Sequence, residues 1–303
     1  MKIKFRDVRL SKANKERLNA INDIIIEYQN EGYKLTLRQL YYQLVSRDVI
    51  PNKQSEYSKL STLLKEGRMG GIVDWDAIED RLRQPSSPSS WDTPQDAMES
   101  LIAQYKLPRM EGQQNYIEVW VEKDALSGVL KRVTEKYHIP ILVNRGYSSA
   151  SAMFDAYNRF RTGIKNILES NEDEGANVII FYLGDFDPSG MDMIRDIEDR
   201  IKEFATKHFE HFPLDVIPIA LTKEQIRKYN PPPNPAKRTD PRANKFIQEH
   251  GVTSWEVDAL PPNVLNELLE DAIKQHINVG MYKEIVSREK ADKDRLEELK
   301  GQL

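Results

Sequence analysis

Apolar residues recur at helical spacing in the first part of the chain. The pattern predicts a helix that begins after Ser11, ends near Gly32 and buries a face made of Leu18, Ile21, Ile24, Ile25 and Tyr28. A second helix is predicted to begin at Leu37, because Thr36 and Gln39 have the spacing of a capping box. Both predictions use local spacing only, and together they indicate a small helical unit.

A third helix is predicted over residues 55–66. Its inward positions would be Tyr57, Leu60, Leu63 and Leu64, and its outward positions Lys59 and Lys65. Three glycines, Gly67, Gly70 and Gly71, are expected to end it and to form a turn or short wing before another helix over residues 75–82. Three helices followed by a wing are typical of a winged-helix DNA-binding domain, which we place at residues 1–83.

The pattern changes after a linker. Residues 84–94 are rich in proline and serine, a connecting helix is predicted from Pro94 to about Tyr105, and residues 84–112 are assigned to this connection. Strand-like runs then alternate with helical stretches, the strands at 116–123, 139–146, 177–187 and 214–221 and the helices at 125–137, 149–169 and 189–205. This alternation predicts an α/β fold with a mostly parallel sheet covered by helices. An irregular loop is expected over 228–242, and a charged helical tail after Met281.

Charge is distributed unevenly along the chain. Residues 1–70 hold 14 Lys and Arg against 8 Asp and Glu, a net charge of +6, so with −4 for the whole chain the remainder carries −10. A basic part of this kind indicates an anionic partner, here double-stranded DNA. The chain has no cysteine and no apolar run long enough to span a bilayer, so a cytoplasmic, DNA-associated protein with no membrane partner is expected.

Three acidic residues are expected at one edge of the sheet. Glu122 ends the first predicted strand, and Asp185 and Asp187 end the third. Carboxyl ends of parallel strands are where ligands gather, and oxygen-only ligands suit Mg²⁺ or Mn²⁺. Other readings of the two aspartates are a helix N-cap, a phosphatase nucleophile pair or a sugar-nucleotide metal motif, although Pro188 departs from the phosphatase pattern. Taken alone, Glu122 is a polar edge residue.

The motifs together carry a resemblance. EVWVEKDAL, NRGYSSA and LGDFDPSGMDM resemble the Toprim domain, and GDFDPSG resembles the form found in topoisomerase VI A subunits and their meiotic double-strand-break relatives. The resemblance implies a winged-helix domain followed by a Toprim domain at residues 113–303 with a C-terminal extension, a Mg²⁺-dependent homodimer, and metal bound by Glu122, Asp185 and Asp187. Ser189 stands where many Toprim proteins have a third acid. The chain is shorter than a typical A subunit and contains nothing that resembles an ATPase, so an ATPase would be a separate B-type subunit.

The same resemblance implies a tyrosine nucleophile. It places Arg38 and Tyr42 of LRQLYYQLV at the family's arginine and catalytic tyrosine. Helix geometry predicts Tyr41 in the core and Tyr42 exposed on the flank that carries Arg38, where the guanidinium could favour the phenolate and bind the phosphate. The alternative is a surface tyrosine paired with an arginine. In the family, the tyrosine of one protomer meets the metal of the other, which is why a dimer is expected.

Other segments give weaker signals. Lys59, Lys65, Arg68 and Lys237 are candidates for contacts with DNA phosphates, and RTDPRANKF, with Arg238 and Arg242, is either such a contact or a solvated loop. WEVDALPP, which contains Trp255, Glu256 and Asp258, resembles a late E-x-x-AL segment of the family. Its expected role is packing.

Three hypotheses for function follow. The first is a DNA-cleaving, topoisomerase-like transesterase in which Tyr42 attacks a phosphate with Glu122 at the catalytic metal site. The second keeps the metal centre but uses water as the nucleophile, giving a Toprim nuclease. The third is a non-catalytic DNA-binding subunit in which the acids retain a structural ion.

Overall fold

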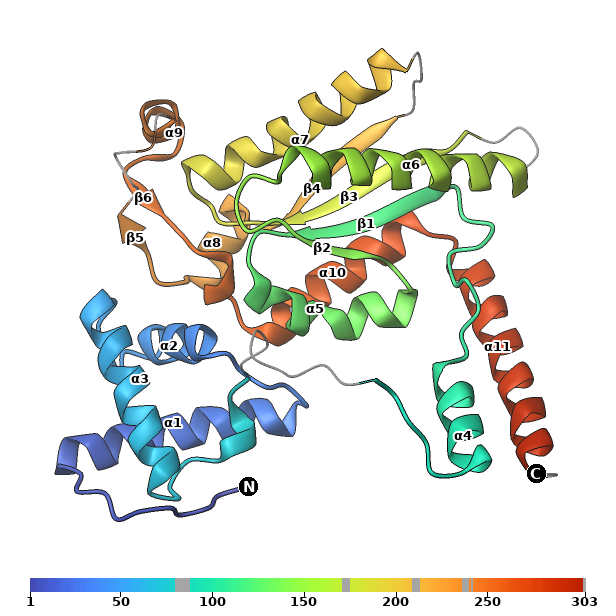
Figure 1. Cartoon of the computed structure of the whole chain (residues 1–303). Helices are drawn as coiled ribbons and strands as arrows, with labels where there is room; N and C mark the ends of the chain where they lie inside the picture. The colour runs from blue at the N-terminus through green and yellow to red at the C-terminus, as the bar shows by residue number, and fades with distance from the viewer. Residues whose placement is uncertain (80–87, 171–174, 209–212, 236–239, 241, 302–303) are drawn as a thin grey trace.

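The computed structural model describes residues 1–79, 88–170, 175–208, 213–235, 240 and 242–301. Figure 1 shows a helical unit, residues 1–79, beside a larger sheet unit built from the described part of residues 113–278. No helix within the described ranges is both long and apolar enough to cross a membrane.

The helical unit forms around one apolar core. Its helices are α1 Lys12–Asn30, α2 Leu37–Ser46 and α3 Gln54–Met69. Ser11 caps α1 by accepting a hydrogen bond from the backbone N–H of Asn14, and the predicted apolar face of α1 is buried. The capping box of α2 is present as predicted, with Thr36 and Gln39 each bonded to the other's backbone. Local sequence signals therefore determined both helix starts.

The glycine-rich segment after α3 differs from its prediction. The helix continues to Met69 and Gly70 is its C-cap, so Gly67 lies inside the helix instead of ending it. A Cβ at Gly67 would come within 2.8 Å of the Leu18 side chain, which explains a glycine there by close packing. Where the wing was predicted, the described residues form only isolated bridges, Lys4 with Gly70 and Leu35 with Ile78. In place of the helix over 75–82 there is a 3-10 turn, Trp75–Ala77, and residues 80–83 lie outside the described ranges.

The sheet unit contains the parallel sheet that the alternation predicted. Its strands are β1 Asn115–Val121, β2 Ile141–Val143, β3 Asn177–Leu183 and β4 Leu214–Ala220, in the order β2-β1-β3-β4, and all neighbours are parallel. The connecting helices are α5 Asp124–Tyr137, α6 Ala150–Ser170 and α7 Pro188–Lys207. The bounds of each helix lie within about two residues of its predicted range.

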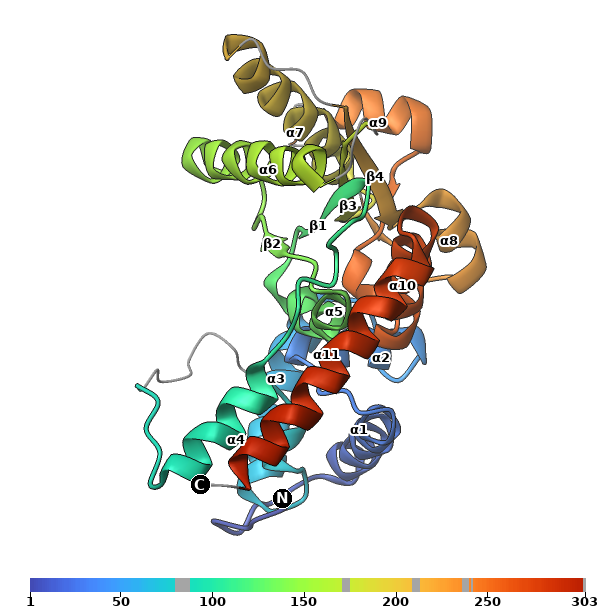
Figure 2. The ribbon, with the colours of Figure 1, turned by 90° about the vertical axis from the view of Figure 1, so that its right-hand side faces the viewer.

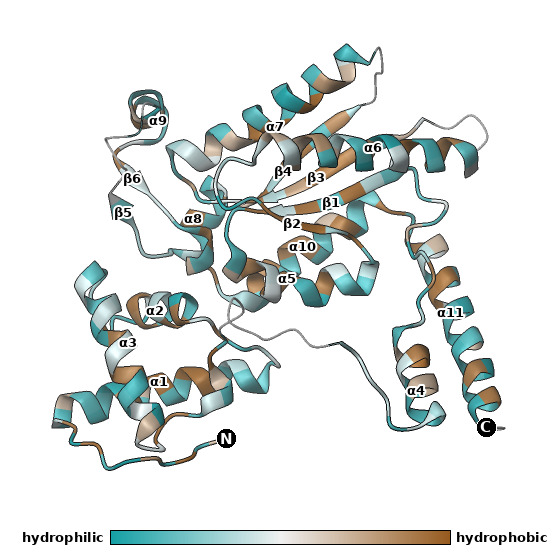
Figure 3. Ribbon diagram, in the orientation of Figure 1, coloured by the Kyte–Doolittle hydropathy of each residue, from teal (hydrophilic) through white to brown (hydrophobic). Residues whose placement is uncertain are grey.

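Alternating side chains on the strands build a core on each face of the sheet. Val119 and Phe181 face α5 and α10 (Pro262–His276), whereas Trp120 and Tyr182 face α6 and α7. Figure 1 shows these helix pairs on opposite faces, and in Figure 3 the strands between them are predominantly hydrophobic. Because both faces are covered, the strands carry continuous apolar runs.

The remaining elements surround the sheet. They are α8 Lys223–Tyr229, α9 Ala243–His250, the paired strands β5 Asn234–Pro235 and β6 Thr253–Ser254, and a 3-10 turn at Val257–Ala259. The connecting helix α4, Pro94–Gln104, lies beside the long C-terminal helix α11, Val279–Lys300, in both ribbon views (Figures 1 and 2). The buried Glu289 of α11 holds Arg109 at 2.7 Å next to this pair.

The helical unit contacts the sheet unit through the turn Val257–Ala259. This turn packs against α2, and Ala259 belongs to the apolar core of the helical unit. A polar contact lies nearby, where the Asn52 side chain donates to the Pro233 carbonyl at 3.0 Å. The WEVDALPP segment therefore has the packing role expected for it. It also brings α2 to the carboxyl edge of the sheet.

Candidate functional site

Glu122 and Asp185 lie together at the carboxyl edge of the sheet. Val121 pairs with Leu183 at the ends of β1 and β3, so the residues that follow these strands are neighbours. The Glu122 carboxylate accepts a hydrogen bond from the Asp185 backbone N–H at 2.9 Å. The topology thus places these two acids side by side, as the parallel arrangement predicted.

Asp187 has a different local role. One of its carboxylate oxygens accepts hydrogen bonds from the backbone N–H of Gly190 at 2.7 Å and from the Ser189 hydroxyl at 2.8 Å. It is the N-cap of α7, which was one of the readings left open for the aspartate pair. Ser189, at the position of the family's third acid, thus helps to fix Asp187.

Lys123 lies among three carboxylates that include Asp185. Its ammonium is 2.7 Å from Asp185 Oδ1 and 2.9 Å from both Glu256 Oε2 and Asp258 Oδ1. Asp185 Oδ1 also accepts a hydrogen bond from the Val257 backbone N–H at 2.9 Å. Sequence reasoning did not select Lys123, although it directly follows Glu122.

Arg38 joins the same group of charges from the helical unit. It pairs with Glu256, and its Nε lies 2.8 Å from Asp258 Oδ2. Its guanidinium is also 5.8 Å from the centre of the Tyr42 ring, in line with the predicted shared flank. We refer to Arg38, Lys123, Asp185, Glu256 and Asp258 as the junction cluster, because these side chains connect the two units.

Tyr42 is buried, so the prediction that it would be exposed is wrong. Only 5% of Tyr42 is accessible, the same fraction as for Tyr41, whose place in the core was predicted correctly. The helical period identifies the face that packs within the helical unit. It does not reveal that the turn Val257–Ala259 covers another part of α2. In this covered region the Glu256 carboxylate lies close enough to Tyr42 to raise the pKa of its phenol.

Burial and mutual repulsion change the protonation of the acids. Burial raises the pKa of Asp185 to about 7, with repulsion from Glu122 and Asp258 adding to the shift and Lys123 opposing it. The pKa of Glu122 is also raised, first by burial and then by the charges of Asp187 and Asp258, although its hydrogen bond with Asp185 and the charge of Lys123 oppose the shift. These acids repel one another, so a cation at this edge would favour their ionised forms.

The two cations of the junction cluster lower the pKa of Glu256. Burial alone would raise its pKa, but Lys123 and Arg38 outweigh burial and hold the pKa of Glu256 at about 2. The pKa of Tyr42 is raised above its ordinary value by burial and by the charges of Glu256 and Asp258, while Arg38 opposes the shift. Tyr42 is therefore held as a neutral phenol in this arrangement.

The three predicted metal ligands fit a hard divalent cation by donor type. All three are carboxylates, and carboxylate oxygens are the ligands that Mg²⁺ and Mn²⁺ prefer. One oxygen of each is already engaged, by Val257 and Lys123 for Asp185 and by hydrogen bonds for Glu122 and Asp187. Within the described ranges, no three His, Asp or Glu side chains converge closely enough to hold an ion. Metal binding here would require these carboxylates to turn.

The predicted DNA-contact residues have varied surroundings. Lys65 is exposed on α3, and Lys59 is exposed but paired with Glu56 at 2.6 Å. Arg68 turns inward and donates to the carbonyls of Trp75 and Ile78, both at 3.1 Å. Lys237 and Arg238 lie outside the described residues, and Arg242 is paired with Asp192 and Asp240.

Gly190 packs closely against the backbone of Asp185. A Cβ there would lie 2.2 Å from the Asp185 carbonyl oxygen, and no side chain can fit without moving that backbone. We expect Gly190→Ala to lower the free energy of unfolding by about 1–3 kcal/mol, as overpacking does. Gly175→Ala is a matched control, because an added Cβ there meets nothing within 4 Å. Urea unfolding of both variants measures the difference, and equal stability would contradict the tight turn.

Comparison with known proteins identified no relative. No protein-family model matches the chain, and no curated protein sequence matches it. Any functional assignment therefore depends on the motifs and on the geometry of the carboxyl edge.

Proposed function

We propose that the chain is a DNA-cleaving transesterase that depends on Mg²⁺ or Mn²⁺ and resembles the A subunit of a type IIB topoisomerase. The observation that supports this most is the position of α2, which holds Arg38 and Tyr42 against the edge where Glu122 and Asp185 lie. The residues proposed as nucleophile and phosphate-binding cation therefore lie near two of the three proposed metal ligands in one chain.

The proposed reaction exchanges one phosphodiester for another. The Tyr42 phenolate oxygen attacks a DNA phosphorus, the bond to the 3′ oxygen breaks, and that oxygen takes up a proton. As in the family that the motifs resemble, the products are a 5′-phosphotyrosyl link and a free 3′-hydroxyl. Arg38 would bind the phosphate and favour the phenolate. A cation held by Glu122, Asp185 and Asp187 would stabilise the negative charge that develops on the phosphate oxygens.

Double-stranded DNA, a second copy of the chain and a separate ATPase subunit are the partners that belong to this proposal. Two copies would cut both strands of a duplex. A second copy is not needed to bring the tyrosine near the carboxyl edge, because Tyr42 lies beside Arg38, which pairs with Asp258 of the same chain. The junction would have to open for Tyr42 to reach a phosphate in either copy.

Hydrolysis is the second candidate, and the burial of Tyr42 favours it. A buried phenol with a raised pKa is a poor nucleophile near neutral pH, whereas water can reach the exposed part of the carboxyl edge. In that case the same carboxylates would serve a nuclease, and Tyr42 would be a structural residue of the junction.

The test uses end-labelled duplex DNA incubated with the protein and Mg²⁺ or Mn²⁺, followed by denaturation. We expect labelled DNA to remain covalently attached to the wild-type protein, and Asp185→Ala to abolish both attachment and cutting. Cutting without attached label would establish the nuclease instead. A complete lack of cutting with either metal would overturn both candidates and leave a non-catalytic DNA-binding role.

A further inference from the structure

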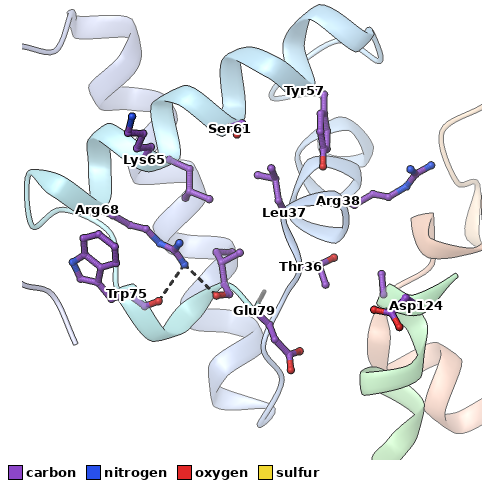
Figure 4. A pocket seen from close by; sticks show the side chains of 13 residues that line it. Thr36, Leu37, Arg38, Tyr57, Ser61, Lys65, Arg68, Trp75, Glu79 and Asp124 are labelled. Atoms are coloured by element: carbon purple, nitrogen blue, oxygen red, sulfur yellow. Dashed lines mark hydrogen bonds between the residues drawn. The ribbon is translucent and has the colours of Figure 1, made fainter. Parts of the chain in front are cut away.

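A cavity of about 580 Å³ lies between the helical unit and the start of α5 (Figure 4). It is bordered by α3, the start of α2, the segment from Trp75 to Glu79, and Asp124 at the first turn of α5. Cavities of this size, placed between structural units, are typical sites for small ligands or for one group of a larger ligand.

The walls of the cavity differ in chemistry. Leu37, Leu64 and Ile78 form an apolar part of the lining. In Figure 4, Ser61 and Lys65 on α3 lie on one side, and Asp124 lies on the other. A ligand that fits would have an apolar, flat body, an anionic end and donor groups at the opposite edge.

Lys65 is the cation available to an anionic end. It is exposed, and among the described residues no carboxylate lies within ion-pair distance of it. Lys59 on the same helix is different, because Glu56 already neutralises it at 2.6 Å. Arg68 also lines this wall, but its Nη2 donates to backbone carbonyls and its Nε is buried.

Asp124 supplies acceptors on the other side. Among the described residues its carboxylate has one ion-pair partner, Arg145 at 3.4 Å, which leaves acceptor capacity for a ligand. A carboxylate accepts hydrogen bonds but donates none when ionised. It therefore favours a ligand edge that carries amino groups over one that carries only carbonyl oxygens.

These features match a nucleotide. We propose that the cavity binds one nucleotide of a DNA strand, with its base on the apolar lining, its phosphate at Lys65 and Ser61, and an amino group of the base at Asp124. Guanine, adenine and cytosine have such an amino group and thymine does not. This inference rests on the proposed function, since it makes the cavity part of the path that DNA takes.

The place of the cavity relative to Arg38 supports a DNA strand as the ligand. Arg38 lines the cavity, and its guanidinium continues to Glu256 and Asp258 in the junction cluster. In Figure 4 the guanidinium points away from Lys65 and Arg68. A nucleotide in the cavity would thus lie next to the phosphate that Arg38 and Tyr42 are proposed to receive.

Binding can be tested apart from cleavage. Tyr42→Phe protein with EDTA and no added metal is titrated by calorimetry with dGMP, dTMP and single-stranded oligonucleotides of each base. We expect dTMP and oligo-dT to bind at least about fivefold more weakly than dGMP and oligo-dG. This factor is the low end of the discrimination that a side-chain contact with a base edge provides. Asp124→Asn should reduce this difference, and oligonucleotide should displace dGMP.

Variants on the phosphate side complete the test. Lys65→Gln should weaken every nucleotide at least about threefold, whereas Lys15→Gln, an exposed lysine on α1 that does not line the cavity, should leave affinity unchanged. Equal affinity for dGMP and dTMP, or no effect of Lys65→Gln, would overturn the site. Binding of dGMP that oligonucleotide cannot displace would assign the cavity to a free nucleotide instead. Because no metal or nucleophile is present, these outcomes are independent of whether the protein cleaves DNA.

Discussion

Replacing Tyr42 with phenylalanine is expected to reduce the covalent attachment of DNA to the protein at least about a thousandfold. The phenol oxygen is the atom that forms the new bond in the proposed reaction, and phenylalanine lacks it. The measurement is the amount of end-labelled DNA retained on denatured protein in the presence of Mg²⁺ or Mn²⁺. Binding of intact duplex should persist, because that step uses other side chains.

Tyr41→Phe is the matched control for this variant. Tyr41 is the preceding residue and is equally buried, but its hydroxyl donates to Asn52 at 3.0 Å and to the Lys53 carbonyl at 3.2 Å. Loss of that hydroxyl should cost about 1 kcal/mol of stability and leave DNA attachment intact. Attachment that survives in Tyr42→Phe, or is lost equally in Tyr41→Phe, would show that Tyr42 is not the nucleophile.

The pH dependence of attachment gives a further expected result. The pKa of Tyr42 is raised above that of a free phenol, so the phenolate is rare at neutral pH. As long as the pH is below this pKa, each increase of one pH unit raises the phenolate fraction about tenfold. The cleavage rate should therefore increase from pH 6 to pH 9. A rate that levels off near pH 7 would indicate another titrating group, such as a general base for water.

The sequence predicted the parts of the fold that depend on local pattern. The capping box at Thr36 and Gln39, the apolar face of α1 and the strands β1 and β3 all appear where expected. In each case the responsible residues are close in sequence, and a single period or cap determines the element. The adjacency of Glu122 and Asp185 followed from one further rule, that parallel strands end at the same edge.

Features that depend on contacts between distant segments could not be predicted in this way. Arg38 and Glu256 are 218 positions apart, and the contact between their two segments is what leaves Tyr42 covered. The WEVDAL segment does contain a signal, because its two acids, Glu256 and Asp258, have the same spacing as Asp185 and Asp187. The role predicted for this segment, however, was packing. Lys123 carries no sequence signal of its own, because a lysine beside an acid is usually solvated, whereas here it has three carboxylate neighbours.

Asp258→Ala is expected to have the largest effect on stability, lowering the free energy of unfolding by about 3–5 kcal/mol. The Asp258 side chain has no exposed surface, and its carboxylate pairs with Lys123 and Arg38 at 2.9 and 2.8 Å. Removing one partner of a buried group of ion pairs leaves the opposite charges without their counter-charge in a poorly solvated place. Asp199→Ala is the matched control, because Asp199 is 59% exposed and pairs with Arg195 at 2.8 Å, and it should cost no more than about 1 kcal/mol.

The same variant tests whether charge holds α2 against the sheet. The experiment follows urea unfolding together with nitration of Tyr42 by tetranitromethane, located by mass spectrometry of the tryptic peptides. If the junction cluster keeps Tyr42 covered, Asp258→Ala should be less stable and its Tyr42 should be nitrated faster than in the Asp199→Ala control. A loss of stability with Tyr42 still unreactive would mean that the apolar contact of Ala259 with the helical unit suffices to cover it. Access of Tyr42 to DNA would then require separation of that apolar contact, since loss of the ion pairs alone would leave the phenol buried.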